Sequence, residues 1–125
     1  MPVVLVIDDD VFIRELLMLH LRKAGYEVRA AADPAVGIKA VLESPPDLIL
    51  LDVDMPYMSG LDVLRALKAD DKSRHIPVIM LTAHTDDETW MAANQAGANA
   101  YLTKPIAHEE LFETVAKWLK NSGKP

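Results

Sequence analysis

Aspartates follow directly on two apolar segments of this chain. The run Val3–Ile7 is followed by Asp8-Asp9-Asp10, and the run 48–51 is followed by Asp52. Each run has the length of a buried strand and is too short for a typical helix, so each acid is expected where a strand leaves a sheet. Carboxylates that meet at one sheet edge repel one another unless a cation or a protein ammonium group neutralises them. Because ligands bind at that edge in α/β folds, the pattern indicates a site.

The elements that would position these acids form a doubly wound parallel sheet. Apolar runs alternate with helical patterns five times, which is typical of repeated βαβ units. The first, third and fourth runs are unbroken, whereas the second and fifth are mixed and suit the sheet edges. The prediction is therefore a flavodoxin-like (βα)5 fold with strand order 2-1-3-4-5. Its strands are expected at 3–7, 26–31, 48–51, 77–81 and 100–103.

Helix boundaries are marked by residues that commonly begin or end helices. Apolar residues three and four positions apart predict a helix over 10–24, which Gly25 ends. Asp10 is interpreted as the N-cap of this helix rather than as a ligand. The other helices are expected to begin or end at Pro34, Ser59-Gly60, Asp86 or Asp87, and Gly97.

Length, charge and cysteine content restrict the class of protein. The 125 residues, half of them hydrophobic, suit one domain, expected over 1–121, with 122–125 as a frayed tail or the start of a linker. A net charge of −6 without an acidic tail argues against binding nucleic acid or anionic membrane through a broad basic surface. The absence of cysteine excludes thiol chemistry. Without a basic leader or an apolar run of membrane-spanning length, a soluble cytoplasmic protein is expected.

Further polar residues would reach the same sheet edge. Thr82 ends the fourth apolar run, and Lys104-Pro105 follows the fifth. With Asp8-Asp9 and Asp52, they resemble the response-regulator receiver domain, the phosphoacceptor half of two-component signalling. Thr82 lies 30 residues after Asp52, Tyr101 another 19 residues on, and Lys104 three more, and these intervals fit the family. The likeness covers essentially the whole chain.

The resemblance implies a phosphoacceptor and a metal site. The stretch 52–56 with Gly60 matches the family's segment after the acceptor, which makes Asp52 the residue that takes a phosphoryl group from a histidine kinase or phosphotransfer protein. Asp9 and Asp52 would bind Mg²⁺ directly, with the backbone carbonyl of Asp54 as a third ligand and Asp8 acting through water. Such a protein is a signalling phosphoacceptor, not an enzyme acting on other substrates, although it catalyses its own phosphorylation and dephosphorylation.

The resemblance also implies a switch. Lys104 would contact one phosphoryl oxygen, and the hydroxyl of Thr82 would donate to another. Thr82 would move toward the phosphoryl group while Tyr101, a half-buried strand residue by the simpler interpretation, turns inward behind it. The change would be read on the surface of the fourth helix, fifth strand and fifth helix, by a downstream protein or a second copy of the chain.

Three positions refine this hypothesis. Trp90 has polar helical neighbours, so it is either an exposed contact on the partner surface or partly buried under the last helix. Asp54 and His84 each lie two residues after a site residue, where the family places the path of the attacking water, and could tune dephosphorylation. The other histidines, which have no metal-ligand spacing and are interpreted as surface or helix-face residues, are His20, His75 and His108.

Two other functions remain open at this point. The segment 52–54, Asp-Val-Asp after an apolar strand, also resembles the nucleophile and acid pair of a haloacid-dehalogenase-type phosphatase. Against that reading, the motif follows the third strand and a second acidic cluster precedes it. A pseudo-receiver that only binds partners would lack key residues, but all are present. Without an effector domain in 125 residues, the chain is either a single-domain regulator, slightly favoured by its length, or a fragment of a longer one.

Overall fold

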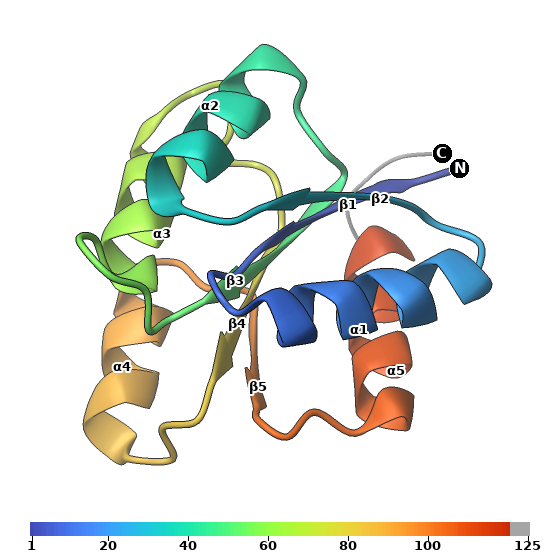
Figure 1. Ribbon diagram of the computed structural model, residues 1–125. Helices are drawn as coiled ribbons and strands as arrows, with labels where there is room; N and C mark the ends of the chain where they lie inside the picture. Colours follow the sequence, from blue (N-terminus) through green and yellow to red (C-terminus); the bar gives the residue numbers. More distant parts are fainter. Residues whose placement is uncertain (121–125) are drawn as a thin grey trace.

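The computed structural model describes residues 1–120, in which five strands alternate with five helices (Figure 1). The strands are β1 (Val3–Ile7), β2 (Glu27–Ala31), β3 (Leu48–Asp52), β4 (Val78–Thr82) and β5 (Ala100–Thr103). The helices are α1 (Val11–Lys23), α2 (Pro34–Glu43), α3 (Gly60–Ala69), α4 (Asp87–Gln95) and α5 (His108–Lys120). The tail predicted at 122–125 lies outside the described residues.

Element boundaries differ from the predicted ones by a residue. Strand β4 begins at Val78 and includes Thr82, where a strand over 77–81 was expected. Pro77 has no N–H to donate, and only its carbonyl takes part in pairing, accepting a hydrogen bond from the backbone of Ile49 at 3.0 Å. Thr82 pairs with Thr103 of β5, so the ladder continues to the polar end of the strand.

All four strand pairs are parallel and the strand order is β2-β1-β3-β4-β5, as predicted. The three central strands are buried almost completely, whereas both edge strands carry exposed positions. In the pairing of β1 with β3, Ile7 lies opposite Leu51. The residues that follow, Asp8 and Asp52, therefore leave the sheet side by side.

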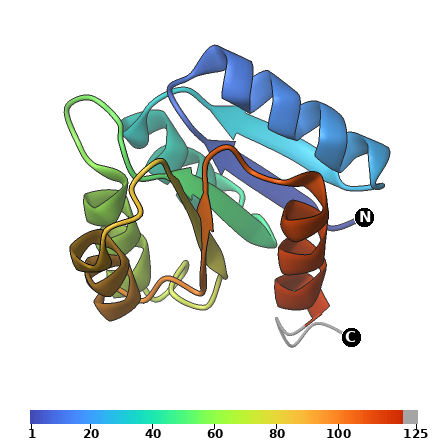
Figure 2. The same cartoon turned by 90° about the horizontal axis from the view of Figure 1, so that it is seen from below.

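Two layers of helices enclose the sheet. Helices α1 and α5 cover one face, and α2, α3 and α4 cover the other (Figures 1 and 2). Alternate strand residues point to opposite faces: Val4 and Val6 pack toward α1 and α5, while Leu5 and Ile7 pack toward the other three helices. Each face of the sheet therefore has its own hydrophobic core, and both cores end at the row of polar residues at the strand ends.

Aspartate or serine side chains cap four of the helices. The carboxylate of Asp10 accepts from the backbone N–H groups of Phe12 at 2.9 Å and Ile13 at 3.3 Å, which confirms its structural role. At α4 the cap is Asp86 and not Asp87. The remaining two caps are Asp33 and Ser59.

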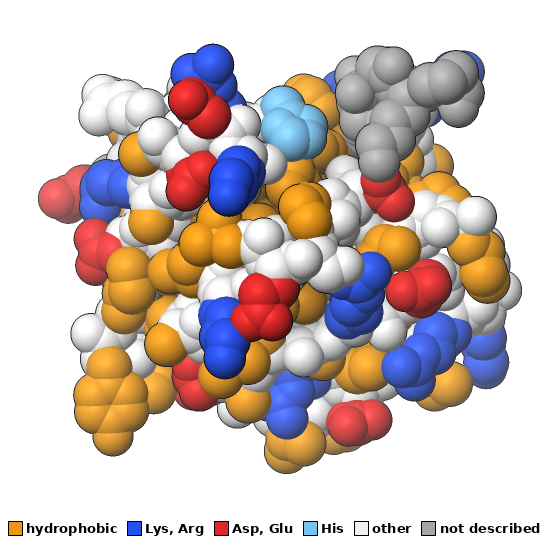
Figure 3. Space-filling model, turned by 90° about the horizontal axis from the view of Figure 1, so that it is seen from above, with side chains coloured by type: hydrophobic (Ala, Val, Ile, Leu, Met, Phe, Trp, Pro, Cys, Tyr) orange, Lys and Arg blue, Asp and Glu red, His pale blue; other side chains and the backbone are white. Residues whose placement is uncertain are grey.

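Acidic and basic side chains are mixed on the face nearest α2 (Figure 3). Apolar atoms lie between them, and the face in this view carries no broad area of one charge sign. Within residues 1–120, no helix combines the length and the apolar character needed to span a membrane.

Candidate functional site

Three carboxylates converge at the carboxyl edge of the sheet. Oxygen atoms of Asp8, Asp9 and Asp52 all lie within 4.8 Å of one another. Asp8 is completely buried and Asp52 is 3% exposed, whereas Asp9 faces solvent. The predicted meeting of these acids is therefore confirmed, and two of the three are removed from water.

An ammonium group lies between the two buried acids. Lys104 places Nζ 3.0 Å from Oδ2 of Asp8 and 3.1 Å from Oδ1 of Asp52. Its backbone N–H donates to the carbonyl of Thr82 at 2.7 Å, which fixes the lysine at the end of β5. The Lys104–Pro105 peptide bond, whose isomer the sequence left open, is cis.

The charges of this cluster are not balanced. Burial and the neighbouring charge of Asp8 raise the pKa of Asp52 to about 6, although Lys104 acts in the opposite direction. Burial alone would lower the pKa of Lys104, but its hydrogen bond to Asp8 and the charge of Asp52 raise it above its ordinary value. One lysine among three acids leaves the edge negative when all are ionised. Carboxylate oxygens in this arrangement are the hard donors that Mg²⁺ prefers, so the residues present fit a divalent cation.

Gly60 allows the loop after Asp52 to close tightly. Its backbone N–H donates to the carbonyl of Val53 at 2.8 Å. A Cβ atom at position 60 would clash with the backbone carbonyl oxygen of Asp52. The start of α3 can therefore pack against the end of β3 only with glycine here.

Thr82 and Tyr101 contact the same loop. The buried hydroxyl of Thr82, at the end of β4, accepts a hydrogen bond from the backbone N–H of His84 at 3.0 Å. The hydroxyl of Tyr101 donates to the backbone carbonyl of His84 at 3.2 Å. Burial raises the pKa of Tyr101, and its side-chain hydrogen bond with Thr82 opposes the rise. The two residues predicted to switch together are thus linked through one residue of the β4–α4 loop.

His84 and Asp54 are bonded to each other. Nε2 of His84 lies 2.9 Å from Oδ1 of Asp54, and Nδ1 lies 3.7 Å from Oδ1 of Asp86. The hydrogen bond to Asp54 and the charge of that carboxylate raise the pKa of His84. The sequence placed each residue near the site separately, but their bond joins the loops that follow β3 and β4.

Trp90 is exposed on α4. The relative exposure of Trp90 is 52%, so about half of its surface faces solvent, as an exposed contact residue requires. Together with Tyr101 it lines two adjoining hollows of about 190 and 510 Å³ along α4 and β5. An aromatic side chain therefore stands beside the loop that Thr82 and Tyr101 contact.

Two of the other histidines lie on helix faces, as expected, and contact each other. The rings of His20 on α1 and His108 on α5 are in contact, with centroids 3.7 Å apart and planes tilted by 53°, and Phe112 lies near both. Nε2 of His20 is buried without a hydrogen-bond partner. Burial, followed by the charges of His108 and Lys23, lowers the pKa of His20. His108 is exposed and His20 is half-buried, and their contact joins α1 to α5.

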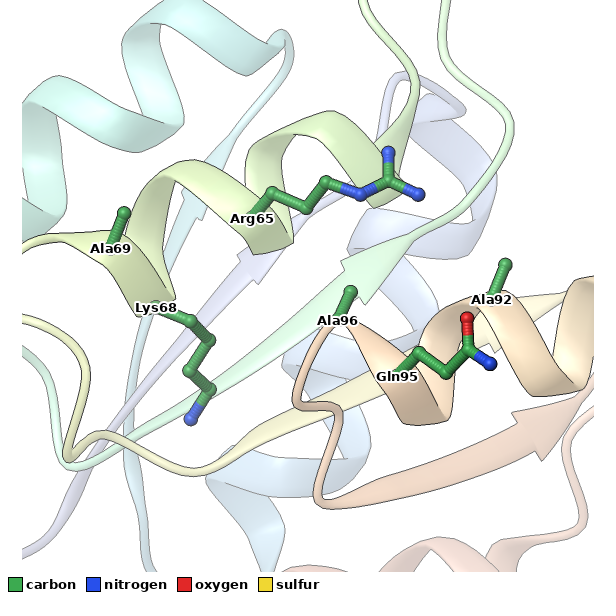
Figure 4. A pocket seen from close by; sticks show the side chains of 6 residues that line it. All are labelled: Arg65, Lys68, Ala69, Ala92, Gln95 and Ala96. Carbon is green, nitrogen blue, oxygen red and sulfur yellow. The ribbon is translucent and has the colours of Figure 1, made fainter.

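A groove separate from these hollows lies between α3 and α4 (Figure 4). It has a volume of about 430 Å³, and small alanine side chains form much of its lining. Lys68 at this groove donates to the carbonyls of Arg74 at 3.2 Å and Ile76 at 2.8 Å, and to Oδ1 of Asn99 at 3.2 Å. These acceptors precede β4 and β5, at the sheet edge opposite the acids. Lys68 therefore fastens the connections into those strands and is separate from the acidic site.

Comparison with known proteins identifies related chains. The family model of the response regulator receiver domain matches residues 4–116. The chain is 38% identical over 122 residues to the DNA-binding dual master transcriptional regulator RpaA of Synechocystis, and 38% identical over 123 residues to the DNA-binding response regulator MtrA of Mycobacterium tuberculosis. Each alignment covers 98% of this chain but only 51% and 53% of those proteins, so the chain spans about half the length of these curated relatives.

Solved structures agree with these relatives. A putative response regulator from Chloroflexus aurantiacus has a TM-score of 0.91 and 35% identity, covering 95% of this chain and 98% of that one. The chemotaxis protein CheY4 of Vibrio cholerae has a TM-score of 0.89 and 33% identity, covering 94% of this chain and 98% of its own. Each covers the five-stranded sheet and its helices nearly completely.

Proposed function

This chain belongs to the response-regulator receiver family, and on that premise we propose that Asp52 accepts a phosphoryl group from a sensor histidine kinase or a phosphotransfer protein. The observation that carries the proposal is the position of Asp52, which is buried at the sheet edge and shares the ammonium group of Lys104 with a second buried acid, Asp8. The family match favours this function over that of a haloacid-dehalogenase-type phosphatase.

The transfer can be written on the residues of the site. A carboxylate oxygen of Asp52 forms a bond to phosphorus while the bond from phosphorus to the donor's imidazole nitrogen breaks. The nitrogen keeps the electron pair and later takes a proton. Nζ of Lys104 already lies 3.1 Å from Oδ1 of Asp52, so it is positioned to bind an oxygen of the incoming group. We assign the hydroxyl of Thr82 to a second oxygen.

The acids would hold Mg²⁺. Asp9 and Asp52 would supply direct ligands, and the backbone carbonyl of Asp54 would be the third ligand from the protein. Asp8 would act through water. When bound, the ion would neutralise the carboxylates and the negative charge of the phosphoryl group. The negative charge left at the edge by a single lysine supports this assignment.

Phosphorylation would change the conformation of the α4–β5–α5 surface, which a partner would recognise. If the hydroxyl of Thr82 turns to a phosphoryl oxygen, it gives up its bond with the backbone of His84, which Tyr101 also contacts. Trp90 next to Tyr101 would then contact a downstream protein or a second copy of the chain. Unchanged partner affinity and dimerisation in Trp90→Ala would remove this residue from the proposal. A cytoplasmic location, testable by fractionation, belongs to the same proposal.

Asp54 and His84 would set the lifetime of the phosphoryl group. Because their side chains are bonded, removing either one frees the other to reorient toward the attacking water. Asp54→Ala and His84→Ala are therefore expected to change the decay rate in the same direction, and the double variant to differ little from either. Unchanged lifetimes in both single variants would remove the idea.

One experiment separates the candidate functions. The protein is incubated with Mg²⁺ and acetyl phosphate, and its intact mass is followed for wild type and Asp52→Asn. A receiver gains one phosphoryl group in wild type alone. Turnover of phosphomonoesters would indicate a phosphatase, and the absence of both would indicate a binding module. A lack of Asp52-dependent modification overturns the proposal.

A further inference from the structure

The surface formed by α4, β5 and the start of α5 is rich in acids. The two helices flank the edge strand β5, and both begin near the carboxyl edge of the sheet (Figures 1 and 2). Helix α4 contains no lysine or arginine, and the lysines of α5 lie in its last turn. The exposed acids of the α4 cap and of the first two turns of both helices are Asp86, Asp87, Glu88, Glu109, Glu110 and Glu113.

Two aromatic rings lie within this acidic surface. Trp90 and Tyr101 both line the adjoining hollows of about 190 and 510 Å³. The other residues that line the larger hollow are Thr85, Asp86, Asp87 and Thr103. None of these residues is basic, so the lining of the larger hollow combines apolar ring surface with two carboxylates.

The two carboxylates differ in how far the protein itself engages them. Oδ2 of Asp86 accepts from the backbone N–H of Thr89 at 2.9 Å and from its hydroxyl at 2.8 Å, as the cap of α4. The side chain of Asp87 has no hydrogen bond or ion pair with any residue among 1–120. The oxygens of Asp87 are therefore available to a ligand that enters the larger hollow.

A cationic side chain with an apolar stem fits this lining. An arginine or lysine head is attracted to the face of a tryptophan ring and to carboxylates, and its methylene stem packs on apolar surface. We infer that the larger hollow takes an arginine or lysine side chain from a basic segment of the downstream protein. This inference rests on the proposed function, under which the α4–β5–α5 surface contacts a partner.

A second copy of the chain does not fit the same place. In a symmetric dimer through this surface, each patch meets an identical one. The acids at the start of α4 and α5 would then face the same acids of the other copy, and like charges across an interface are strongly unfavourable. The occupant is therefore a different protein.

Tyr101 connects the hollow to the acceptor site. Its ring lines both hollows, and its hydroxyl donates to the backbone carbonyl of His84 at 3.2 Å. The backbone N–H of the same residue donates to the hydroxyl of Thr82. If Thr82 turns to a phosphoryl oxygen and Tyr101 moves inward, one wall of the hollow moves as well. The affinity for a cationic side chain should therefore depend on phosphorylation.

A peptide library tests the charge of the partner. Wild type with Mg²⁺ and beryllofluoride, as the mimic of the phosphoryl group, is applied to peptides in which one position is fixed as each amino acid in turn and the others are randomised. We expect arginine and lysine to be favoured at the fixed position and the acidic residues to be disfavoured. Omitting beryllofluoride should change the affinity of the best peptide.

Reversing one charge on each side locates the contact. Asp87→Lys should bind the best peptide about tenfold more weakly or worse, and replacing the arginine or lysine of that peptide by glutamate should restore binding to this variant but not to wild type. Asp71→Lys is the matched control, because it reverses an exposed acid that precedes β4, at the opposite sheet edge, and should bind like wild type.

Several outcomes would overturn the inference. They are a preference for acidic or uncharged residues, the retention of no peptide, equal weakening in Asp87→Lys and Asp71→Lys, and equal affinity with and without beryllofluoride. Dimerisation of wild type with beryllofluoride that Asp87→Lys abolishes in sedimentation would also overturn it, because a second copy would then occupy the surface. Failure of acetyl phosphate to modify Asp52 in wild type would instead overturn the proposed function.

Discussion

Lys104 places its Nζ atom 3.1 Å from Oδ1 of Asp52, although the strands from which the two residues extend are separated by β4. The same atom contacts Asp8 at 3.0 Å, so one cation bridges the two acids that are hidden from water. The free energy of this arrangement depends on the ammonium group, because an unpaired buried carboxylate is strongly unfavourable.

Replacing Lys104 is therefore expected to destabilise the fold. Lys104→Met keeps the aliphatic stem and removes the charge, which should lower the free energy of unfolding by about 3 kcal/mol in EDTA. Millimolar Mg²⁺ should restore part of the loss. Urea unfolding measures both effects. Lys39→Met, at a side chain 78% exposed, is the control and should change the free energy by less than about 0.5 kcal/mol. Equal stabilities of the two variants would contradict the prediction.

The raised pKa of Asp52 predicts a dependence of stability on pH. The pKa of its carboxyl group is about 6 in the folded state, above its ordinary value of 3.8, so the folded state binds more protons between these values. Without metal, wild type should lose stability as pH rises from about 4 to about 6. Asp52→Asn lacks this loss and should be more stable by up to about 3 kcal/mol at pH 7.

Unfolding curves in EDTA at several pH values check this expectation. Asp71→Asn provides a control, because that side chain is 86% exposed. A constant difference between wild type and Asp52→Asn over this pH range would show that the carboxyl group is not perturbed.

The contact between His20 and His108 predicts a dependence of stability on pH with the opposite sign. Because the folded state lowers the pKa of His20, the unfolded state binds more protons, and the contribution of this residue to stability falls as pH drops below about 6.5. His20→Phe keeps a ring against His108 and Phe112 but cannot be protonated. Thermal unfolding at pH 7.5 and pH 5.5 should show a smaller loss of Tm in this variant than in wild type. His75→Phe, an exposed histidine, should behave like wild type.

Gly60→Ala should damage the acceptor loop. The added methyl group clashes with the backbone carbonyl oxygen of Asp52, so either α3 or the end of β3 must move. We expect a loss of about 2 to 4 kcal/mol in the free energy of unfolding and slower labelling of Asp52 by acetyl phosphate. Gly25→Ala is a useful contrast, because it has positive φ but no atom near the added Cβ. It should lose stability without a change in labelling.

The sheet was predictable because the distribution of apolar and polar residues in the sequence indicates which strands are buried. Unbroken apolar runs belong to strands covered on both faces, and mixed runs belong to the edges, so the strand order follows from composition. The acids at the strand ends were then forced together by parallel pairing. The same logic located Lys104, which follows directly on the fifth strand.

Contacts between distant side chains were not predictable in this way. The ring contact between His20 and His108 depends on the packing of two helices, and neither sequence position carries a periodic signal for it. The bond between Asp54 and His84 depends on the shapes of two loops. The positive φ of Tyr57 opposes the preference of its residue type, so no rule based on local preference could have suggested it.

The contact between Asp8 and Lys104 joins residues 96 positions apart. While the protein is being synthesised, the acids emerge from the ribosome long before the lysine and the last strand do. A partly made chain therefore carries the acceptor aspartate without the group that neutralises it. If the proposed function holds, an unfinished chain would not accept phosphoryl groups at Asp52. The chain would become able to accept them only when Lys104 and the last strand have been made.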